Sequence, residues 1–333
     1  MSAADADAGT GERLRRAART PVASARSLAG RLRRTPGPYR RYRELQAENK
    51  QLRDTYETWV PPGHFYSPYP DLADYERRAA GLLDPGSVLP GVDLREDEQL
   101  ALLAELAPLM AEAPFPEHEG EGDGRWRYWY DNYAYGYGDG VVLHAMLRRL
   151  RPSRVVEVGS GYSSALLLDT VDGWLPGTEV TFVEPFPALL ESLLRPDDED
   201  RVTIHRAPVQ DVAPDVFEAL GPGDVLFVDS THVSRAGSDV NHLLFEVFPR
   251  LRPGVWVHVH DIFFPFEYPT DWVREGRAWT EAYVVRAFLT FNPAFAIRWF
   301  QDMLWVRHRE ALAALPWVAR NPGGNLWLER LDP

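Results

Sequence analysis

The chain of 333 residues contains no cysteine, which excludes disulfide bonds, thiolate metal sites and cysteine nucleophiles together. Any metal ion would have to bind carboxylate, imidazole or water ligands. No apolar run approaches the roughly 20 residues that span a membrane, and the N-terminus lacks the apolar stretch of a secretory signal. With 45% apolar residues, the composition favours a soluble globular protein, and cytoplasmic residence is the expectation.

Positive charge is scarce outside the first residues. The net charge of −13 argues against nucleic acid as a partner, but residues 1–53 carry 13 Lys and Arg against 5 Asp and Glu. That stretch has a net charge of +8 and the remainder −21. We predict a basic arm over 1–60, disordered up to residue 36 and helical over 39–56. Such an arm could be solvated, or could mediate oligomer, partner or membrane-surface contact.

Residues 61–140 are expected to form an aromatic-rich helical lid or cap. Pro61, Pro62 and Gly63 end the preceding helix, and a new helix is predicted over 96–111. The segment GRWRYWYDNYAYGYGDG at 124–140 is unusually dense in Trp and Tyr. These aromatic side chains either seal an edge of the core or line a ligand pocket.

Short β-branched runs alternate with helical stretches from residue 155 onward. The pattern predicts strands at 155–159, 180–184, 202–207, 225–230 and 255–261, separated by helices such as 163–171, 188–195 and 238–251. Buried strands alternating with helices indicate a parallel sheet covered on both faces. We therefore predict a doubly wound, Rossmann-like α/β domain over 141–333, with an antiparallel edge formed by 294–300 and 325–329.

A glycine pair follows the first predicted strand, in the sequence Glu157-Val158-Gly159-Ser160-Gly161. Glycine at a strand exit permits a sharp turn and a close approach of a ligand. Glu184 ends the second predicted strand, where a carboxylate can accept hydrogen bonds from both hydroxyls of a ribose. A dinucleotide site would need a third glycine where this chain has Ser164.

These motifs resemble those of the class I S-adenosylmethionine (SAM) dependent methyltransferases, over roughly residues 137–330. The resemblance implies that the glycine loop and Glu157 shape the methionine side of a SAM site, that Glu184 holds the ribose, and that residues after the third strand lie near the adenine. The aromatic segment would add Tyr137. The predicted cofactor-binding residues are Glu157, Gly159, Ser160, Gly161, Glu184, Gln210, Asp211 and Tyr137.

Acidic and imidazole side chains end the fourth and fifth predicted strands. VDSTH carries Asp229 and His232, and VHVHD carries His260 and Asp261. Neighbouring parallel strands would bring these groups to one edge of the sheet, so Asp229, His260 and Asp261 are predicted as ligands of a divalent metal ion.

The same pattern resembles the metal-assisted sugar and macrolide O-methyltransferases and the cephalosporin hydroxylase-like proteins. In those proteins the two residues at the end of this strand are usually Glu-Asp, whereas this chain has His260-Asp261. The imidazole makes manganese or iron conceivable beside magnesium. A sub-branch in which His260 is no ligand stays open.

His232 is the predicted catalytic base, because imidazole accepts protons near neutral pH. The leading hypothesis is a divalent-metal-assisted O-methyltransferase that acts on a hydroxyl of a glycosyl or natural-product acceptor. The alternatives are an iron-dependent oxidative enzyme on the same scaffold and a non-catalytic SAM-binding scaffold protein.

Overall fold

The computed structural model describes residues 59–121 and 124–332. The described residues from Pro62 onward form one compact unit. The predicted helix at 39–56 and almost all of the basic arm lie outside the described residues. Among the described residues, no helix is both long enough and apolar enough to cross a membrane.

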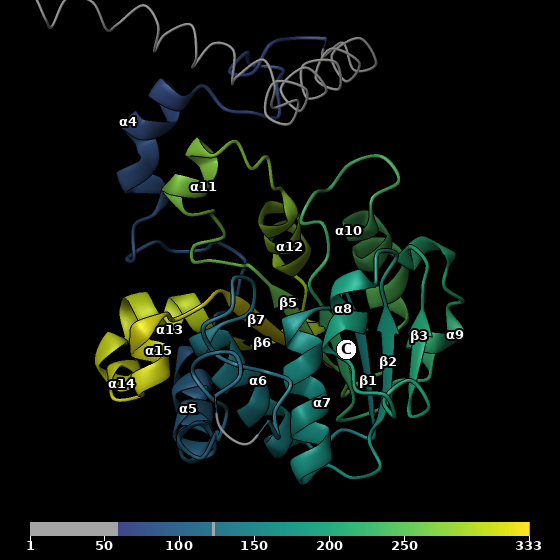
Figure 1. Ribbon diagram of the computed structural model, residues 1–333. Helices are drawn as coiled ribbons and strands as arrows, with labels where there is room; N and C mark the ends of the chain where they lie inside the picture. Colours follow the sequence, from purple (N-terminus) through teal and green to yellow (C-terminus); the bar gives the residue numbers. More distant parts are fainter. Residues whose placement is uncertain (1–58, 122–123, 333) are drawn as a thin grey trace, which may run out of the picture. The chain divides into compact units, whose positions relative to one another are not determined.

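The described residues contain one seven-stranded sheet of order β3-β2-β1-β4-β5-β7-β6 (Figure 1). The first five strands are parallel, and β7 runs antiparallel to both β5 and β6. This confirms the predicted Rossmann-like sheet and its antiparallel edge. The strands are β1 Arg154–Val158, β2 Glu179–Val183, β3 Val202–His205, β4 Val225–Val228, β5 Trp256–His260, β6 Phe295–Phe300 and β7 Asn325–Arg330.

Helices precede the sheet and connect its strands. Those before the sheet are α4 Leu72–Leu82, α5 Glu96–Ala111 and α6 Tyr137–Leu150. Those between β1 and β5 are α7 Tyr162–Trp174, α8 Ala188–Leu193, η1 Val209–Asp211, α9 Asp215–Glu218, α10 Asp239–His242, η2 Leu243–Val247 and η3 Phe248–Arg250. The remainder are α11 Thr270–Arg274, α12 Glu281–Leu289, α13 Gln301–Arg307, α14 Arg309–Ala313 and α15 Pro316–Arg320.

The predicted helix at 238–251 is helical throughout but not uniformly α-helical. After one α-helical turn, its geometry becomes π-helical over η2 and then 3₁₀ over η3. Pro249 explains the change, because it has no N–H to donate and its ring disfavours a regular α-helical turn before it.

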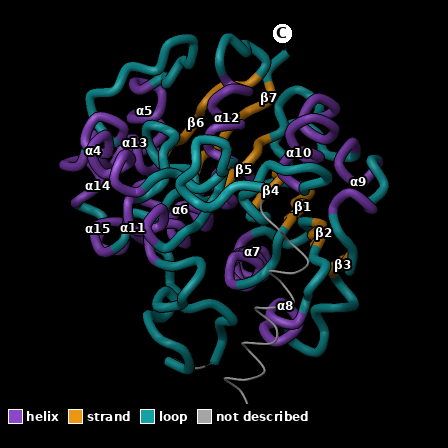
Figure 2. The backbone as a smooth tube through the Cα atoms, turned by 90° about the horizontal axis from the view of Figure 1, so that it is seen from above, coloured by secondary structure: helices purple, strands orange, loops and turns teal. Residues whose placement is uncertain are grey.

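Helices cover both faces of the sheet, with α6 and α7 on one side and α10 and α12 on the other (Figure 2). The strand order reverses beside β1, because β2 pairs on one side of it and β4 on the other. In doubly wound folds the crevice at this reversal, beyond the carboxyl ends of the strands, is where ligands bind.

The aromatic segment 124–140 contributes mainly to the core. Tyr128, Tyr130 and Tyr135 are all fully buried, and α6 already begins at Tyr137. The predicted boundary at residue 140 therefore falls inside α6, which packs against both α5 and α7. Residues 62–140 belong to the same compact unit as the sheet.

Four side chains anchor this segment to α7 and to the loop after α8. Arg127 is buried, and its guanidinium lies 2.7 Å from the Asp169 carboxylate and 2.6 Å from that of Asp198. Asp172 makes a third contact at 2.9 Å. The guanidinium therefore compensates carboxylates that would otherwise be costly to bury.

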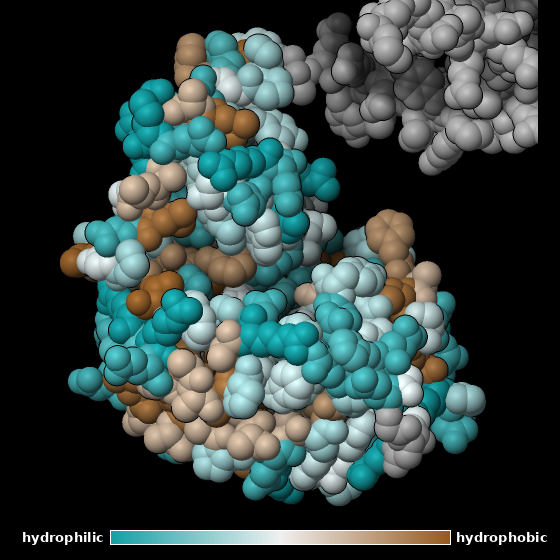
Figure 3. Space-filling view, turned by 60° about the vertical axis from the view of Figure 1, so that its left-hand side comes forward, coloured by the Kyte–Doolittle hydropathy of each residue, from teal (hydrophilic) through white to brown (hydrophobic). Residues whose placement is uncertain are grey.

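Helices α4 and α11 pack against each other above the carboxyl edge of the sheet (Figure 1). The Tyr75 hydroxyl lies 3.3 Å from that of Thr270, and Arg274 pairs with Glu76 at 3.0 Å. Figure 3 shows hydrophobic side chains interleaved with hydrophilic ones on the face that carries this region, rather than one continuous apolar patch. The predicted cap role of residues 61–140 stays a prediction.

Candidate functional site

A cavity of about 360 Å³ lies at the reversal point, beyond the carboxyl ends of β1, β2 and β4. Four residues that the sequence singles out line it: Gly159, Glu184, Gln210 and Asp229. The fold thus brings together residues that follow four separate strands. Further lining residues, which the sequence did not single out, include Phe186, Ser230, Thr231 and Arg235.

Glu184 is fixed by the backbone around the cavity. One carboxylate oxygen accepts a hydrogen bond from the Ser160 amide at 3.0 Å, and the other accepts one from the Phe186 amide at 2.7 Å. Each carboxylate oxygen has more than one lone-pair site, so Glu184 retains capacity for a ligand's hydroxyl groups. The Phe186 side chain beside it is 84% exposed, which leaves its ring available to a ligand.

Gly159 is required by the turn that leaves β1. Its φ of +84° is the left-handed conformation that glycine adopts without strain, and a Cβ built there would lie 1.7 Å from the Asp229 carbonyl oxygen. The turn thus brings the backbone of the glycine loop directly against the end of β4. The sequence signal for this close approach was the glycine itself.

Glu157 and Gly161 do not line the cavity. The Glu157 carboxylate is buried and accepts a 2.5 Å hydrogen bond from the Ser163 hydroxyl. Burial raises its pKa to about 8, although the hydrogen bonds from Ser163 and Ser164 oppose the shift. Its second oxygen is buried without a protein partner in the described structure.

Three of the predicted cofactor-binding residues either have other contacts or do not line the cavity. The Gln210 side chain donates to the Gly237 carbonyl at 2.8 Å, so only part of it faces the cavity. Asp211 follows in η1 but does not line the cavity. Tyr137 stacks on Tyr130 with ring centroids 6.2 Å apart, and the Arg320 guanidinium lies 4.7 Å from its ring. Tyr137 does not line this cavity, and its predicted cofactor contact stays a prediction.

His232 lies beside the cavity, in a buried cluster of ionisable side chains. Its Nε2 is 3.3 Å from an Asp229 oxygen and 3.7 Å from an Asp261 oxygen. Its Nδ1 is 2.8 Å from a Glu281 oxygen. His232 and Asp261 both have positive φ, 59° and 56°, a strained conformation for residues other than glycine that is concentrated at functional sites.

The charges of this cluster oppose the effect of burial. Burial alone would lower the pKa of His232, but hydrogen bonds with Asp229 and Glu281 outweigh it and hold the pKa well above its ordinary value. Burial raises the pKa of Asp261, and the nearby His260 and His232 oppose that shift. The pKa of Asp229 is lowered, because the same two histidines outweigh its burial.

The predicted metal ligands do not form a metal site in this arrangement. His260 Nε2 lies 3.6 Å from Asp261, but its Nδ1 is buried without a partner and its ring packs on Tyr135, with centroids 4.9 Å apart. The nitrogen that faces both Asp229 and Asp261 belongs instead to His232. Over 59–121 and 124–332, no group of three or more His, Asp or Glu side chains is placed to hold a metal ion.

Glu281 is the functional candidate that the sequence did not reveal. It begins α12 and lies 49 residues beyond His232, with no motif to connect the two. Trp279, two residues earlier, packs against the His232 ring at a centroid distance of 4.4 Å. The only local signal is an acidic residue in the first turn of a helix, which is too common to indicate a site.

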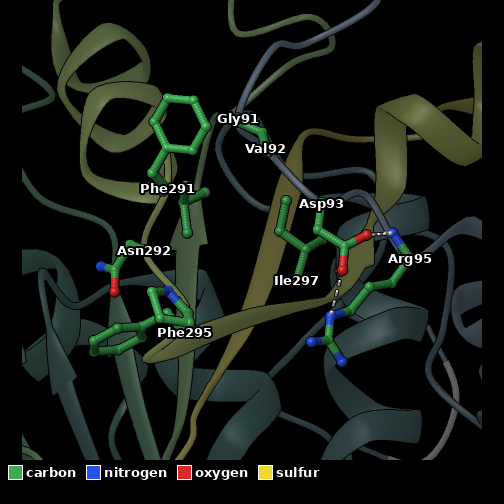
Figure 4. A pocket seen from close by; sticks show the side chains of 10 residues that line it. Gly91, Val92, Asp93, Arg95, Phe291, Asn292, Phe295 and Ile297 are labelled. Carbon is green, nitrogen blue, oxygen red and sulfur yellow. Dashed lines mark hydrogen bonds and ion pairs between the residues drawn. The ribbon is translucent and has the colours of Figure 1, made fainter. Parts of the chain in front are cut away.

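A second cavity of about 400 Å³ lies at the opposite end of the sheet, where β6 begins (Figure 4). Phe291 and Phe295 line it, and the Asp93 carboxylate pairs with Arg95 at 3.3 Å. Its charged groups thus already have partners, and it carries no cluster of catalytic side chains. The cavity beside His232 is therefore the candidate active site.

The comparison with known protein families matches the part of the chain that contains the strands around the candidate active site. Residues 156–262 match the model of a methyltransferase domain family. An uncharacterized protein of Archaeoglobus fulgidus is 30% identical over 168 residues, which are 48% of this chain and 73% of the relative.

Two similar solved structures are the O-methyltransferase TomG of Streptomyces achromogenes, in complex with SAM, and one described as cmcI-D160 Mg-SAM. TomG is 16% identical over 78% of this chain and 96% of its own, with a TM-score of 0.41. The second is 19% identical over the same shares, with a TM-score of 0.37. At these TM-scores, neither structure bears on the roles of individual residues.

Proposed function

Because the chain belongs to the class I family of SAM-dependent methyltransferases, we propose that it transfers the methyl group of SAM to a hydroxyl group of a glycosyl or natural-product acceptor. The observation that carries the proposal is the position of His232, whose Nε2 lies 3.3 Å from Asp229, itself part of the cavity wall. A proton acceptor therefore lies at the rim of the cavity where the cofactor would bind.

The cavity has the features that SAM requires. Glu184 offers a carboxylate to ribose hydroxyls, and the glycine loop leaves the backbone accessible to a ligand. Phe186 offers an aromatic face for the adenine. The Ser160 and Ser230 hydroxyls are buried without protein partners in the described structure, so they are available to a polar ligand. When bound, SAM supplies a methyl group on a positively charged sulfur.

His232 is proposed to take the proton of the acceptor hydroxyl on Nε2. A neutral hydroxyl is a weak nucleophile, and general-base assistance typically contributes a factor of ~10² to 10⁴ to a rate. His232 must be unprotonated at Nε2 to act, whereas Asp229 and Glu281 favour its protonated form. The positive charge of the cofactor would offset these carboxylates and so favour release of that proton.

Aromatic side chains beside His232 support an acceptor with an apolar face. Trp279 contacts the His232 ring, and its own ring packs against Trp272 with centroids 5.1 Å apart. Tyr268 packs on Trp279 as well, at 5.8 Å. Such rings suit the apolar faces of sugars and of polyketide or peptide products. We propose that this wall and the α4–α11 region above it receive the acceptor.

We derive no step through a metal ion, because the predicted ligands do not fit one as they stand. We expect the purified protein to keep its methyltransferase activity after dialysis against EDTA, since Nε2 of His232 occupies the position between the two carboxylates. The measurement is the initial rate before and after chelation. If chelation abolishes the activity and added magnesium, manganese or iron restores it, the result would support the metal-assisted mechanism instead.

Replacing Glu184 by alanine should weaken SAM binding by roughly 10- to 100-fold. The change removes hydrogen bonds to a charged group, each of which contributes about 1.5–3 kcal/mol. Isothermal calorimetry with SAM tests both the family assignment and the residue. Glu179→Ala is the matched control, because Glu179 begins the same strand at its other end and is exposed. The proposal fails if wild-type protein does not bind SAM, or if the Glu184 and Glu179 variants bind it equally.

A further inference from the structure

The loop that carries His232 is tied to the first turn of α12 by its backbone. The His232 carbonyl accepts hydrogen bonds from the amides of Thr280, at 2.9 Å, and Glu281, at 3.1 Å. The Ser234 amide donates to the Thr280 hydroxyl at 2.7 Å. These contacts hold the loop in place without any contribution from the Glu281 side chain.

The side chains of His232 and Glu281 form a buried pair. Nδ1 of His232 lies 2.8 Å from Oε2 of Glu281, and the two residues are only 6% and 3% exposed. Burying a carboxylate is costly unless it is hydrogen-bonded, and His232 Nδ1 is the partner that this carboxylate has. Trp279 restricts the imidazole ring from one of its faces.

The two ring nitrogens of His232 therefore face different surroundings. Nδ1 points to Glu281, whereas Nε2 points to Asp229 and Asp261 beside the cavity. A neutral imidazole carries one N–H, and Glu281, at 2.8 Å from Nδ1, is closer to its nitrogen than Asp229 and Asp261 are to Nε2, at 3.3 and 3.7 Å, so the proton is expected on Nδ1. The opposite nitrogen is then the one with a free lone pair.

We propose that Glu281 is a positioning residue, which keeps the proton of neutral His232 on Nδ1 and so directs the lone pair of Nε2 toward the acceptor hydroxyl. This inference rests on the proposed function. In the reaction, the acceptor O–H bond breaks, its proton joins Nε2, and the oxygen bonds to the methyl carbon while the carbon–sulfur bond of SAM breaks. Glu281 touches neither the acceptor nor the cofactor, and it acts only through His232.

The test compares Glu281→Ala and Glu281→Gln in the full-length protein. We expect Glu281→Ala to lower kcat by about 100-fold, within the range of general-base effects, with the KM for SAM unchanged. Glu281→Gln should stay within about 10-fold of the wild type, because its amide oxygen can still accept the hydrogen bond from Nδ1–H. Glu105→Gln is the control, since Glu105 in α5 is exposed and pairs only with Arg149 among the described residues.

A second readout needs no turnover. The ¹⁵N chemical shifts of His232, measured by nuclear magnetic resonance, report which ring nitrogen carries the proton. We expect the proton of neutral His232 on Nδ1 in the wild type and in Glu281→Gln, and an altered distribution in Glu281→Ala.

Wild-type kcat in Glu281→Ala would overturn the inference, and so would a wild-type His232 that carries its proton on Nε2. A parallel loss of SAM binding and thermal stability in Glu281→Ala would also overturn it, since it would indicate a merely structural role. Wild-type protein that neither binds SAM nor transfers methyl groups would refute the proposed function, whereas the nitrogen shifts would still decide the role of Glu281.

Discussion

Replacing His232 by alanine lowers kcat for methyl transfer by roughly 100-fold or more in our expectation, while SAM affinity stays nearly constant. Once the positive charge of the cofactor favours its neutral form, the imidazole is the group at the cavity rim that can accept a proton, and alanine leaves the acceptor hydroxyl to lose its proton to water. SAM affinity should persist because the cavity wall contains Glu184, Gly159 and Asp229 but not His232 itself. Steady-state kinetics and calorimetry on the same preparation measure the two quantities.

His242→Ala is the matched control for this experiment, because His242 ends α10 and does not line the cavity. Its kcat should equal that of the wild type. Unchanged kcat in His232→Ala would refute the assignment of the base, and the Glu281 inference would then lose its premise. A fall in SAM affinity as large as the fall in kcat would instead assign His232 to the architecture of the cavity.

Arg127→Met should destabilise the fold by about 3–5 kcal/mol, the usual cost of removing one partner from a buried ion pair. The Arg127 side chain is 3% exposed, and those of Asp169 and Asp198 are 1% and 2% exposed. Burial would raise the pKa of Asp198, but the hydrogen bonds from Arg127 and its neighbours hold it at about 2. The variant leaves two buried carboxylates without this guanidinium, although Arg201 still pairs with Asp198.

Urea unfolding measures this effect as a shift of the midpoint at constant m-value. Arg206→Met is the control, because Arg206 is 47% exposed and pairs with two exposed glutamates. Exposed pairs of this kind contribute about 0–1 kcal/mol. An Arg127 variant as stable as the Arg206 variant would mean that the buried network contributes no more than a surface pair. Activity measured well below the midpoint should be normal, since none of the residues of the network lines the cavity.

Much of the fold could be predicted because its signals are local. The run Val225–Val228 is continuous and apolar, and Val155–Val158 is interrupted only by Glu157, as expected of strands covered on both faces, and both runs are strands in the structure. The shared position of the strand ends then followed from the topology, because the carboxyl ends of parallel strands lie at one edge of the sheet. Gly159, Glu184 and Asp229 meet at that edge. The aromatic segment was harder to interpret, because Tyr side chains in a core and in a pocket give the same sequence pattern.

The sequence by itself determined the strands, the parallel sheet and the rim where a cofactor would bind. These features can be predicted because the hydrophobic pattern of a strand and the glycines at its end lie within a few residues of one another in the sequence. Only the tertiary structure decided which groups meet at that rim: Glu281 against Nδ1 of His232 from 49 residues away, His232 rather than His260 between the two carboxylates, and Tyr137 turned toward Arg320. Contacts between distant residues depend on how helices pack onto the sheet, and no local pattern encodes that packing.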